Sequence, residues 1–241
     1  MSPITSEQLD ILNQFKCERL TGDANNKSLI KDFINTRNIG IVENLKDEAW
    51  EEDQNNKVVY YLIKQGDDIV LFFSIKCGGL FTPFEKITDD IKNFKLEDKN
   101  RDKCPHINHV HFSYPAIEIV HFCVNENFRT KWINFGFKDN QPMGKVLFWH
   151  FFPSIIEKLL NLIGCEYLFL FAADSTDDST LVAYYKFDLK FEEADENKLI
   201  APNKPSYDLG CIFLIQKIEN LQKNKKEFFN NFNQDFKNIE D

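Results

Sequence analysis

The sequence predicts one α/β domain, and three observations support this fold class. Two β-rich runs, residues 57–64 and 69–77, are separated by a turn sequence that contains a glycine, which indicates a hairpin. The stretch 117–191 then alternates between strand-like and helix-like patterns: Ile117–Val124, a helix at Leu147–Ile163, and Tyr167–Ala172. Alternation of this kind is typical of a sheet that is covered by helices.

The remaining segments add elements on either side of this centre. Residues 6–20 predict a helix, or a helix followed by a strand, and residues 26–35 predict a short helix. Gly78-Gly79 should end the second hairpin strand. We expect residues 80–113 to form an insertion, in which Phe84, Ile87, Ile91 and Phe94 have helical spacing.

Residues 125–140 read as a long loop, anchored by its aromatic residues, and residues 192–206 as a polar loop. The last strand is expected at 209–218, so that residues 1–218 make up the domain. Residues 219–241 carry apolar side chains three and four positions apart, which predicts an amphipathic C-terminal helix. This helix should pack on its own domain, with a homodimer or partner contact as the alternative.

Composition and charge exclude several classes of protein. Of the 241 residues 43% are hydrophobic, which is typical of a globular chain, and no apolar run has the length of a membrane span. No secretory signal is visible, and the six cysteines are scattered, so we expect reduced thiols in a cytoplasmic protein. The net charge of −9 argues against broad nucleic-acid binding and slightly favours a cationic substrate.

The turn before the long helix is a candidate phosphate site. Backbone N–H groups at a helix N-terminus have no partner within the helix, and the helix dipole favours negative charge there. A pyrophosphate could therefore be bound without a cluster of basic side chains. The residues of this candidate site are Gln141, Pro142, Met143, Gly144, Lys145 and Val146.

Over residues 58–217 the chain resembles the GNAT superfamily of acetyl-CoA-dependent N-acetyltransferases. The segments that carry the resemblance are Tyr114–Ile119, Pro142–Leu147 and Tyr184–Phe191. The family loop is Q/R-x-x-G-x-G/A; Gly144 matches either of its glycines, and either Val146 or Pro142 then departs from the pattern. The resemblance implies a mixed, strongly twisted central sheet with helices on both faces. It also implies transfer of an acetyl group from acetyl-CoA to a primary amine by direct attack.

The resemblance also implies roles for individual residues. Phe122, Cys123 and Val124 would hold the pantetheine arm where two neighbouring strands splay apart. Tyr185 would be the general acid that protonates the leaving thiolate, while Tyr184 would face another way on the helix. Lys190 stands where the family has a glycine before its phenylalanine.

Two polar residues on the central strand are candidates for the general base. Glu118 is the first choice, because a carboxylate on an apolar strand is costly unless it is functional or paired. His121 would face the opposite side of the sheet by strand parity and would more commonly be a core histidine. Asp174 and Ser175 would either contact the substrate or, more simply, end their strand.

We expect no metal. Cys104, His106, His109 and His111 are the only metal-like group, and their spacing does not match a zinc site. Nucleophilic catalysis by Cys123 with His121 has no better support, since nothing identifies an oxyanion hole.

Two other functions remain open. One is a binding module with the same fold, in which the altered loop no longer holds CoA. The other is a toxin-type acetyltransferase that acts on aminoacyl-tRNA, the one nucleic acid that we retain as a candidate. The sequence otherwise leaves the acceptor open, as a small-molecule or peptide amine.

Overall fold

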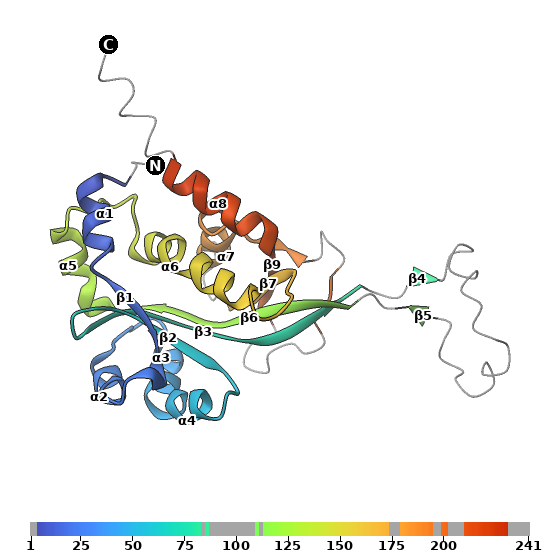
Figure 1. Ribbon diagram of the computed structural model, residues 1–241, viewed down its shortest axis with the longest axis horizontal. Helices are drawn as coiled ribbons and strands as arrows, with labels where there is room; N and C mark the ends of the chain where they lie inside the picture. The colour runs from blue at the N-terminus through green and yellow to red at the C-terminus, as the bar shows by residue number, and fades with distance from the viewer. Residues whose placement is uncertain are drawn as a thin grey trace, which may run out of the picture.

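The computed structural model is a three-layer arrangement with a central sheet and helices on both faces (Figure 1). It describes residues 4–82, 85–86, 109–110, 113–173, 179–194, 199–201 and 210–230. Helices α2, α3 and α4 lie on one face of the sheet, and α6 and α8 lie on the other (Figure 1). This confirms the expected α/β architecture.

The sheet has seven strands in the order β1-β2-β3-β6-β7-β9-β8. Among the strands that the structure describes, β6 and β7 are the one parallel pair in this sheet; the other neighbours are antiparallel. A separate two-stranded ladder joins β4 to β5. The strands are β1 Lys16–Arg19, β2 Val59–Gln65, β3 Asp68–Phe81, β4 Glu85–Lys86, β5 His109–Val110, β6 Ser113–Val124, β7 Tyr167–Ala172, β8 Glu192–Glu193 and β9 Ile212–Lys217.

The helices alternate with these strands along the chain. They are α1 Ser6–Leu12, α2 Asn26–Leu29, α3 Ile39–Asp47, α4 Ala49–Gln54, α5 Arg129–Asn134, α6 Met143–Leu160, α7 Thr180–Ala183 and α8 Ile218–Asn230. Short 3₁₀ turns lie at Leu20–Gly22, Ile30–Asp32 and Glu126–Phe128, and a π-helix spans Tyr184–Asp188. The predicted helix-then-strand at the N-terminus is confirmed, as is the short helical segment near residue 30.

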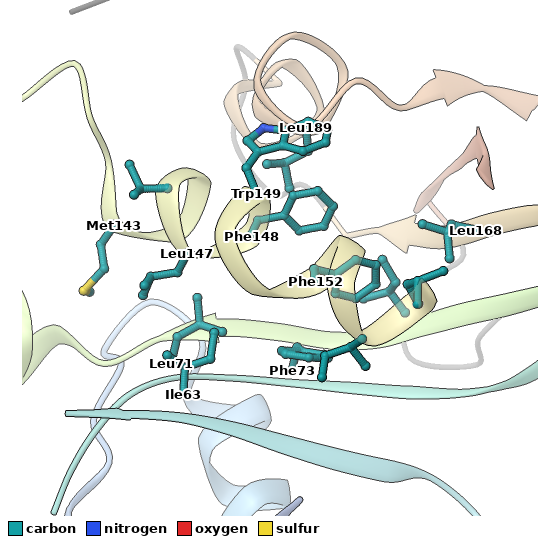
Figure 2. Packing of buried hydrophobic residues seen from close by; sticks show 14 of the residues in the cluster. Ile63, Leu71, Phe73, Met143, Leu147, Phe148, Trp149, Phe152, Leu168 and Leu189 are labelled. Atoms are coloured by element: carbon teal, nitrogen blue, oxygen red, sulfur yellow. The ribbon is translucent and has the colours of Figure 1, made fainter. Parts of the chain in front are cut away.

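Helix α6 is buried along most of its length because its side chains are apolar around nearly the whole circumference. Figure 2 shows Leu147 and Phe152 on the side of α6 that faces the strands. The ring of Phe152 lies 5.2 Å from that of Phe73 on β3, and Phe148 stacks on Phe152 at 4.8 Å. The helix begins four residues earlier than predicted, because Met143–Val146 are buried and helical rather than part of a loop.

Three other expectations were wrong. Strand β3 does not end at Gly78-Gly79 but continues to Phe81. The supposed loop 125–140 contains helix α5, whose Trp132 stacks on Phe137 at 3.7 Å. Glu85–Lys86 form a strand paired with His109–Val110, because pairing partners far along the chain outweigh local helical spacing. The rest of the expected helix near residue 90 lies outside the described residues.

Helix α8 packs against α6 of its own domain, as the simpler interpretation predicted. Phe228 stacks on Trp149 with 6.1 Å between ring centroids, and Lys225 Nζ donates to Ser154 Oγ at 2.7 Å. The predicted helix beyond residue 230 falls outside the described part of the chain. Within that part, no helix is both long and apolar enough to span a bilayer.

Gly78 is required by close packing rather than by a turn. A Cβ at this position would lie 2.6 Å from Cε1 of Phe169 on β7, whereas one at Gly79 would meet nothing nearer than 3.8 Å. A clash of this size forces the ring or the strand to move, so the cost is one of overpacking.

We therefore predict that Gly78→Ala lowers the free energy of unfolding by about 1–3 kcal/mol, measured by urea denaturation. Gly79→Ala is the matched control on the same strand and should change it by less than about 0.5 kcal/mol. Equal effects of the two substitutions would contradict the packing explanation.

Candidate functional site

The central feature of the site is a gap between β6 and β7. The two parallel strands are paired from Ala116↔Tyr167 to Glu118↔Phe169, and the pairing then stops although both strands continue. This confirms the expected splay of neighbouring strands. Backbone groups of β6 beyond Glu118 are therefore not paired with β7.

A bulge in β6 sets the direction of its side chains. Ser74 on β3 pairs with His121, and the next residue, Ile75, pairs with Ile119, so Val120 is an extra residue. The expectation that Glu118 and His121 face opposite sides is wrong, because the bulge changes the parity between them. Both point to the face away from α6: Glu118 pairs with Lys76 there, and His121 stacks on Tyr60 at 5.8 Å.

The register of β3 and β6 decides which backbone groups point into the gap. Asn125 N–H donates to the carbonyl of Val70 at 2.8 Å, which makes Val124↔Leu71 a non-hydrogen-bonded pair. The backbone groups of Val124, and those of Phe122 two residues earlier, therefore point away from β3 and into the gap. Those of Cys123 face β3. The Val124 carbonyl already accepts from Asn35 Nδ2 at 3.0 Å.

The gap opens onto the N-terminus of α6 through a cavity of about 500 Å³. Pro142 is the N-cap of the helix and provides no side-chain capping bond, so the first N–H groups lack that partner. The cavity borders the turn, and the binding of a phosphate there stays a prediction. Its walls include Phe122, Cys123, Val124, Gln141, Pro142, Met143, Gly144, Tyr184 and Tyr185.

Two of the predicted phosphate-site side chains are engaged in structural contacts. Gln141 is buried, and its side-chain amide exchanges hydrogen bonds with that of Gln8 at 3.1 and 3.2 Å. The same Gln141 oxygen accepts from Lys138 N–H at 3.0 Å, and Trp132 Nε1 donates to the Gln141 carbonyl at 3.0 Å. The Gln141 N–H also donates to the Lys138 carbonyl at 2.8 Å, so Gln141 holds the turn in place with both its side chain and its backbone.

Lys145 is the other engaged residue. Its ammonium is buried and forms an ion pair with Asp188, while Trp149 Nε1 donates to the Asp188 carbonyl at 3.0 Å. Two residues one turn apart on α6 thus bind the last residue of the π-helix. The contact fastens the tyrosine-containing segment to the helix that carries the candidate phosphate site. The sequence analysis did not single out Asp188.

Both tyrosines line the cavity, which corrects the expectation that Tyr184 faces elsewhere. Their ring centroids are 5.7 Å apart. A Cβ built on Gly144 would lie 2.8 Å from the Tyr184 hydroxyl, so this phenol reaches the first turn of α6. Burial, then Tyr185 and Asp188, raise the pKa of Tyr184 well above its ordinary value. Its phenol therefore remains protonated at neutral pH.

The candidate bases lie outside the lining of this cavity. The Glu118 carboxylate forms an ion pair with Lys76 Nζ at 3.2 Å. Its role as the general base stays a prediction. His121 Nδ1 lies 2.8 Å from Ser74 Oγ, and burial lowers the pKa of His121 to about 4. It is thus a neutral, hydrogen-bonded histidine in the layer below the sheet.

The cavity also has polar lining that the sequence analysis missed. Asn35 and Asn38 approach from the segment before α3, and Arg129 and Lys138 come from the connection between β6 and α6. No local motif marks these four residues, because they meet only in the folded chain.

Among the residues that the structure describes, no three His, Cys, Asp or Glu side chains are grouped as metal ligands would be. Cys104, His106 and His111 lie outside those residues, as do Asp174 and Ser175.

No family model and no curated protein matches the sequence. Solved structures are similar in fold. A tyrosine-to-phenylalanine mutant of the AtaT toxin is 11% identical, with a TM-score of 0.52 over 92% of this chain and 96% of that chain. A tyrosine-to-phenylalanine mutant of KacT is 12% identical, with a TM-score of 0.52 over 87% and 98%. AtaT complexed with acetyl-methionyl-tRNAfMet is 12% identical, with a TM-score of 0.51 over 86% and 97%. The fold of this chain is the GNAT fold.

The buried pair of Lys145 and Asp188 gives a stability prediction. Asp188→Asn removes the partner of a buried ammonium and should cost about 3 kcal/mol of unfolding free energy. The control is Asp68→Asn, which breaks the exposed pair with Lys131 and should cost less than about 1 kcal/mol. Denaturant titration of both variants tests this, and a small effect of Asp188→Asn would contradict it.

Proposed function

We propose that this protein is an N-acetyltransferase that moves the acetyl group of acetyl-CoA to a primary amine. The observation that carries the proposal is the gap between β6 and β7, which opens onto the uncapped N-terminus of α6 in one cavity with two tyrosines. The similarity in fold to AtaT supports the choice of cofactor, because one solved structure is AtaTR bound with AcCoA.

Each part of the cofactor has a counterpart in the cavity. The pyrophosphate would bind the N–H groups at Met143, Gly144 and Lys145, which a helix leaves without internal partners. The pantetheine arm would pair with the outward backbone groups of Phe122 and Val124, as an added strand does. The arm would thus lie beside β6 where β7 is no longer paired with it.

The transfer needs no covalent enzyme intermediate. The amine nitrogen attacks the thioester carbonyl carbon and forms the new C–N bond, and the carbonyl oxygen becomes negative and is stabilised by backbone N–H groups of β6. The C–S bond then breaks and the thiolate takes a proton from a tyrosine. The nitrogen loses its extra proton to a base, for which Glu118, directly or through water, is the proposed group.

Tyr185 is the proposed acid. A phenol is protonated at neutral pH, and its pKa of about 10 is close to the value of about 8.5 for a thiol. Tyr184 lines the same cavity, and its raised pKa makes it a poorer proton donor but a persistent hydrogen-bond donor. We therefore assign proton transfer to Tyr185, and to Tyr184 a part in binding the cofactor beside the first turn of α6.

A second candidate acceptor is the amino group of an aminoacyl-tRNA. One similar structure is AtaT complexed with acetyl-methionyl-tRNAfMet, and this favours the candidate. The cavity lining has two cationic side chains, Arg129 and Lys138, and one carboxylate, Asp139, in a protein whose net charge is −9. Incubation with [¹⁴C]acetyl-CoA and either aminoacyl-tRNA or amine-bearing peptides separates the two acceptor classes by the molecule that becomes labelled.

Binding of CoA tests the cofactor site directly. We expect calorimetry to show saturable heat of binding, and Gly144→Ala should weaken it at least tenfold, because the new methyl group enters the space beside the Tyr184 hydroxyl. Gly40→Ala is the control, since a Cβ there meets nothing within 4 Å. The absence of heat at high micromolar CoA would favour a binding module of the same fold that does not use CoA.

The roles of the two tyrosines can be separated by kinetics. Tyr185→Phe should lower kcat by about 10²- to 10⁴-fold, the usual contribution of a general acid, with little change in CoA affinity. Tyr184→Phe should mainly raise KM for acetyl-CoA. The reverse result, with the larger loss of kcat in Tyr184→Phe, would transfer the acid role to Tyr184.

A further inference from the structure

The edge of β6 that faces the gap is bounded on both sides. At one end, the pairing with β7 stops after Glu118. At the other end, the segment before α3 lies against the residues that follow β6. Glu126 N–H donates to the Ile34 carbonyl at 2.9 Å, and Asn125 Oδ1 accepts from Ile34 N–H at 3.3 Å. Within the described part of the chain, residues 119–123 remain between these ends as a free edge, with a length of about 16 Å at about 3.3 Å per residue.

Asn35 closes this free edge at Val124. Its Nδ2 donates to the Val124 carbonyl at 3.0 Å, and that carbonyl points away from β3 and into the gap. The donating nitrogen must therefore lie in the gap as well, in the position that an N–H group of a neighbouring strand would have. A ligand arm that pairs with β6 as an added strand reaches Asn35 at this point.

The closed end of the free edge adjoins the candidate phosphate site. A Cβ built on Gly144 would lie 3.4 Å from Val124 Cγ1, so the first turn of α6 begins where the free edge ends. Asn35 thus lies at the junction between the two parts of the site, the strand edge for the arm and the helix N-terminus for the pyrophosphate.

The amide of Asn35 is fixed in orientation by hydrogen bonds at both of its polar atoms. Its Oδ1 accepts from the N–H groups of Arg37 and Asn38 at 3.2 and 3.0 Å, and from Asn38 Nδ2 at 3.2 Å. The residue is 7% exposed and lines the cavity. Because the amide is already ordered, little conformational entropy is lost when it forms one more hydrogen bond.

One donor of this amide is left for a ligand. A primary amide nitrogen carries two hydrogens, and the Val124 carbonyl accepts one of them. No residue in the described ranges accepts the other. A buried donor without an acceptor is unfavourable, so an oxygen atom of a ligand at this position is bound favourably. The pantetheine arm of CoA has such oxygens in its two amide carbonyls and its hydroxyl group.

We propose that Asn35 is a cofactor-binding residue, which closes the free edge at Val124 and donates its second amide hydrogen to an oxygen of the pantetheine arm. This inference rests on the proposed function, since it takes CoA as the occupant of the cavity. It adds the segment before α3 to a site whose other parts come from β6, the turn and the N-terminus of α6.

Calorimetry with three ligands tests the proposal. CoA and 4′-phosphopantetheine contain the arm, whereas adenosine 3′,5′-bisphosphate contains only the nucleotide part. Asn35→Ser is neutral, can still accept from the N–H groups of the turn, and is too short to reach the Val124 carbonyl. Asn35→Asp keeps those acceptor bonds and removes both donor hydrogens, so its binding of CoA covers the case in which the serine variant does not fold.

Thr36→Val is the matched control. The Thr36 hydroxyl joins the same segment to the Glu126 carboxylate at 2.9 Å, but Thr36 does not line the cavity. This variant therefore loosens the attachment of the segment without removing a donor from the site. Urea denaturation of each variant shows whether it is folded before its binding is compared.

We expect Asn35→Ser to bind CoA and 4′-phosphopantetheine about fivefold more weakly, the usual effect of losing one neutral hydrogen bond. Its affinity for adenosine 3′,5′-bisphosphate should not change, which shows that the rest of the cavity is intact. Asn35→Asp should weaken CoA binding at least as much. Thr36→Val should bind all three ligands as the native protein does.

Unchanged or tighter binding of CoA by the folded Asn35 variants overturns the proposal, because the amide would then only compete with the arm for the Val124 carbonyl. Equal weakening of all three ligands in Asn35→Ser, or an equal loss in Thr36→Val, also overturns it, because the effect would then come from the position of the segment. If the native protein binds neither CoA nor 4′-phosphopantetheine, the proposed function fails together with this inference. If it binds both, the results for the variants decide on Asn35 alone.

Discussion

The structure depends on one interruption of hydrogen bonding, the loss of pairing between β6 and β7 after Glu118 and Phe169. Backbone N–H and C=O groups inside a sheet need partners, so a gap between two central strands is costly unless something occupies it. The bulge at Val120 and the close packing of Gly78 on Phe169 lie beside this gap. An extended ligand with amide groups is the natural occupant, because it restores the missing strand contacts.

Helix α6 connects the gap to the rest of the molecule. Its buried apolar surface fixes its position over the sheet, and its N-terminus is fastened from two directions. The amide pair of Gln8 and Gln141 joins the preceding turn to α1, and the ion pair of Lys145 and Asp188 joins the first turn to the tyrosine segment. Gln141 and Lys145 were expected to be phosphate ligands. Their side chains instead hold the backbone amides of the turn in place.

Much of the fold could be predicted because it follows from local pattern. Strand β7 was predicted residue for residue, and the β2–β3 hairpin followed from its alternation and its glycine turn. The errors have a common cause. The start of α6 at Met143, the strand through Gly78 and the orientation of Glu118 and His121 all depend on contacts between segments that are distant in sequence. The spacing of residues within one segment cannot predict such contacts.

The sequence by itself determined the class of fold, the order of its central elements and three of the segments that line the cavity, because apolar periodicity and glycine placement act over a few residues. The tertiary structure alone decided which atoms face a ligand. It turned the backbone of Cys123 toward β3, brought Tyr184 beside Gly144 and placed the Asn35 amide on the Val124 carbonyl. The reason is physical: strand register, a bulge and a buried ion pair set directions in space, and each involves partners that the local sequence does not specify.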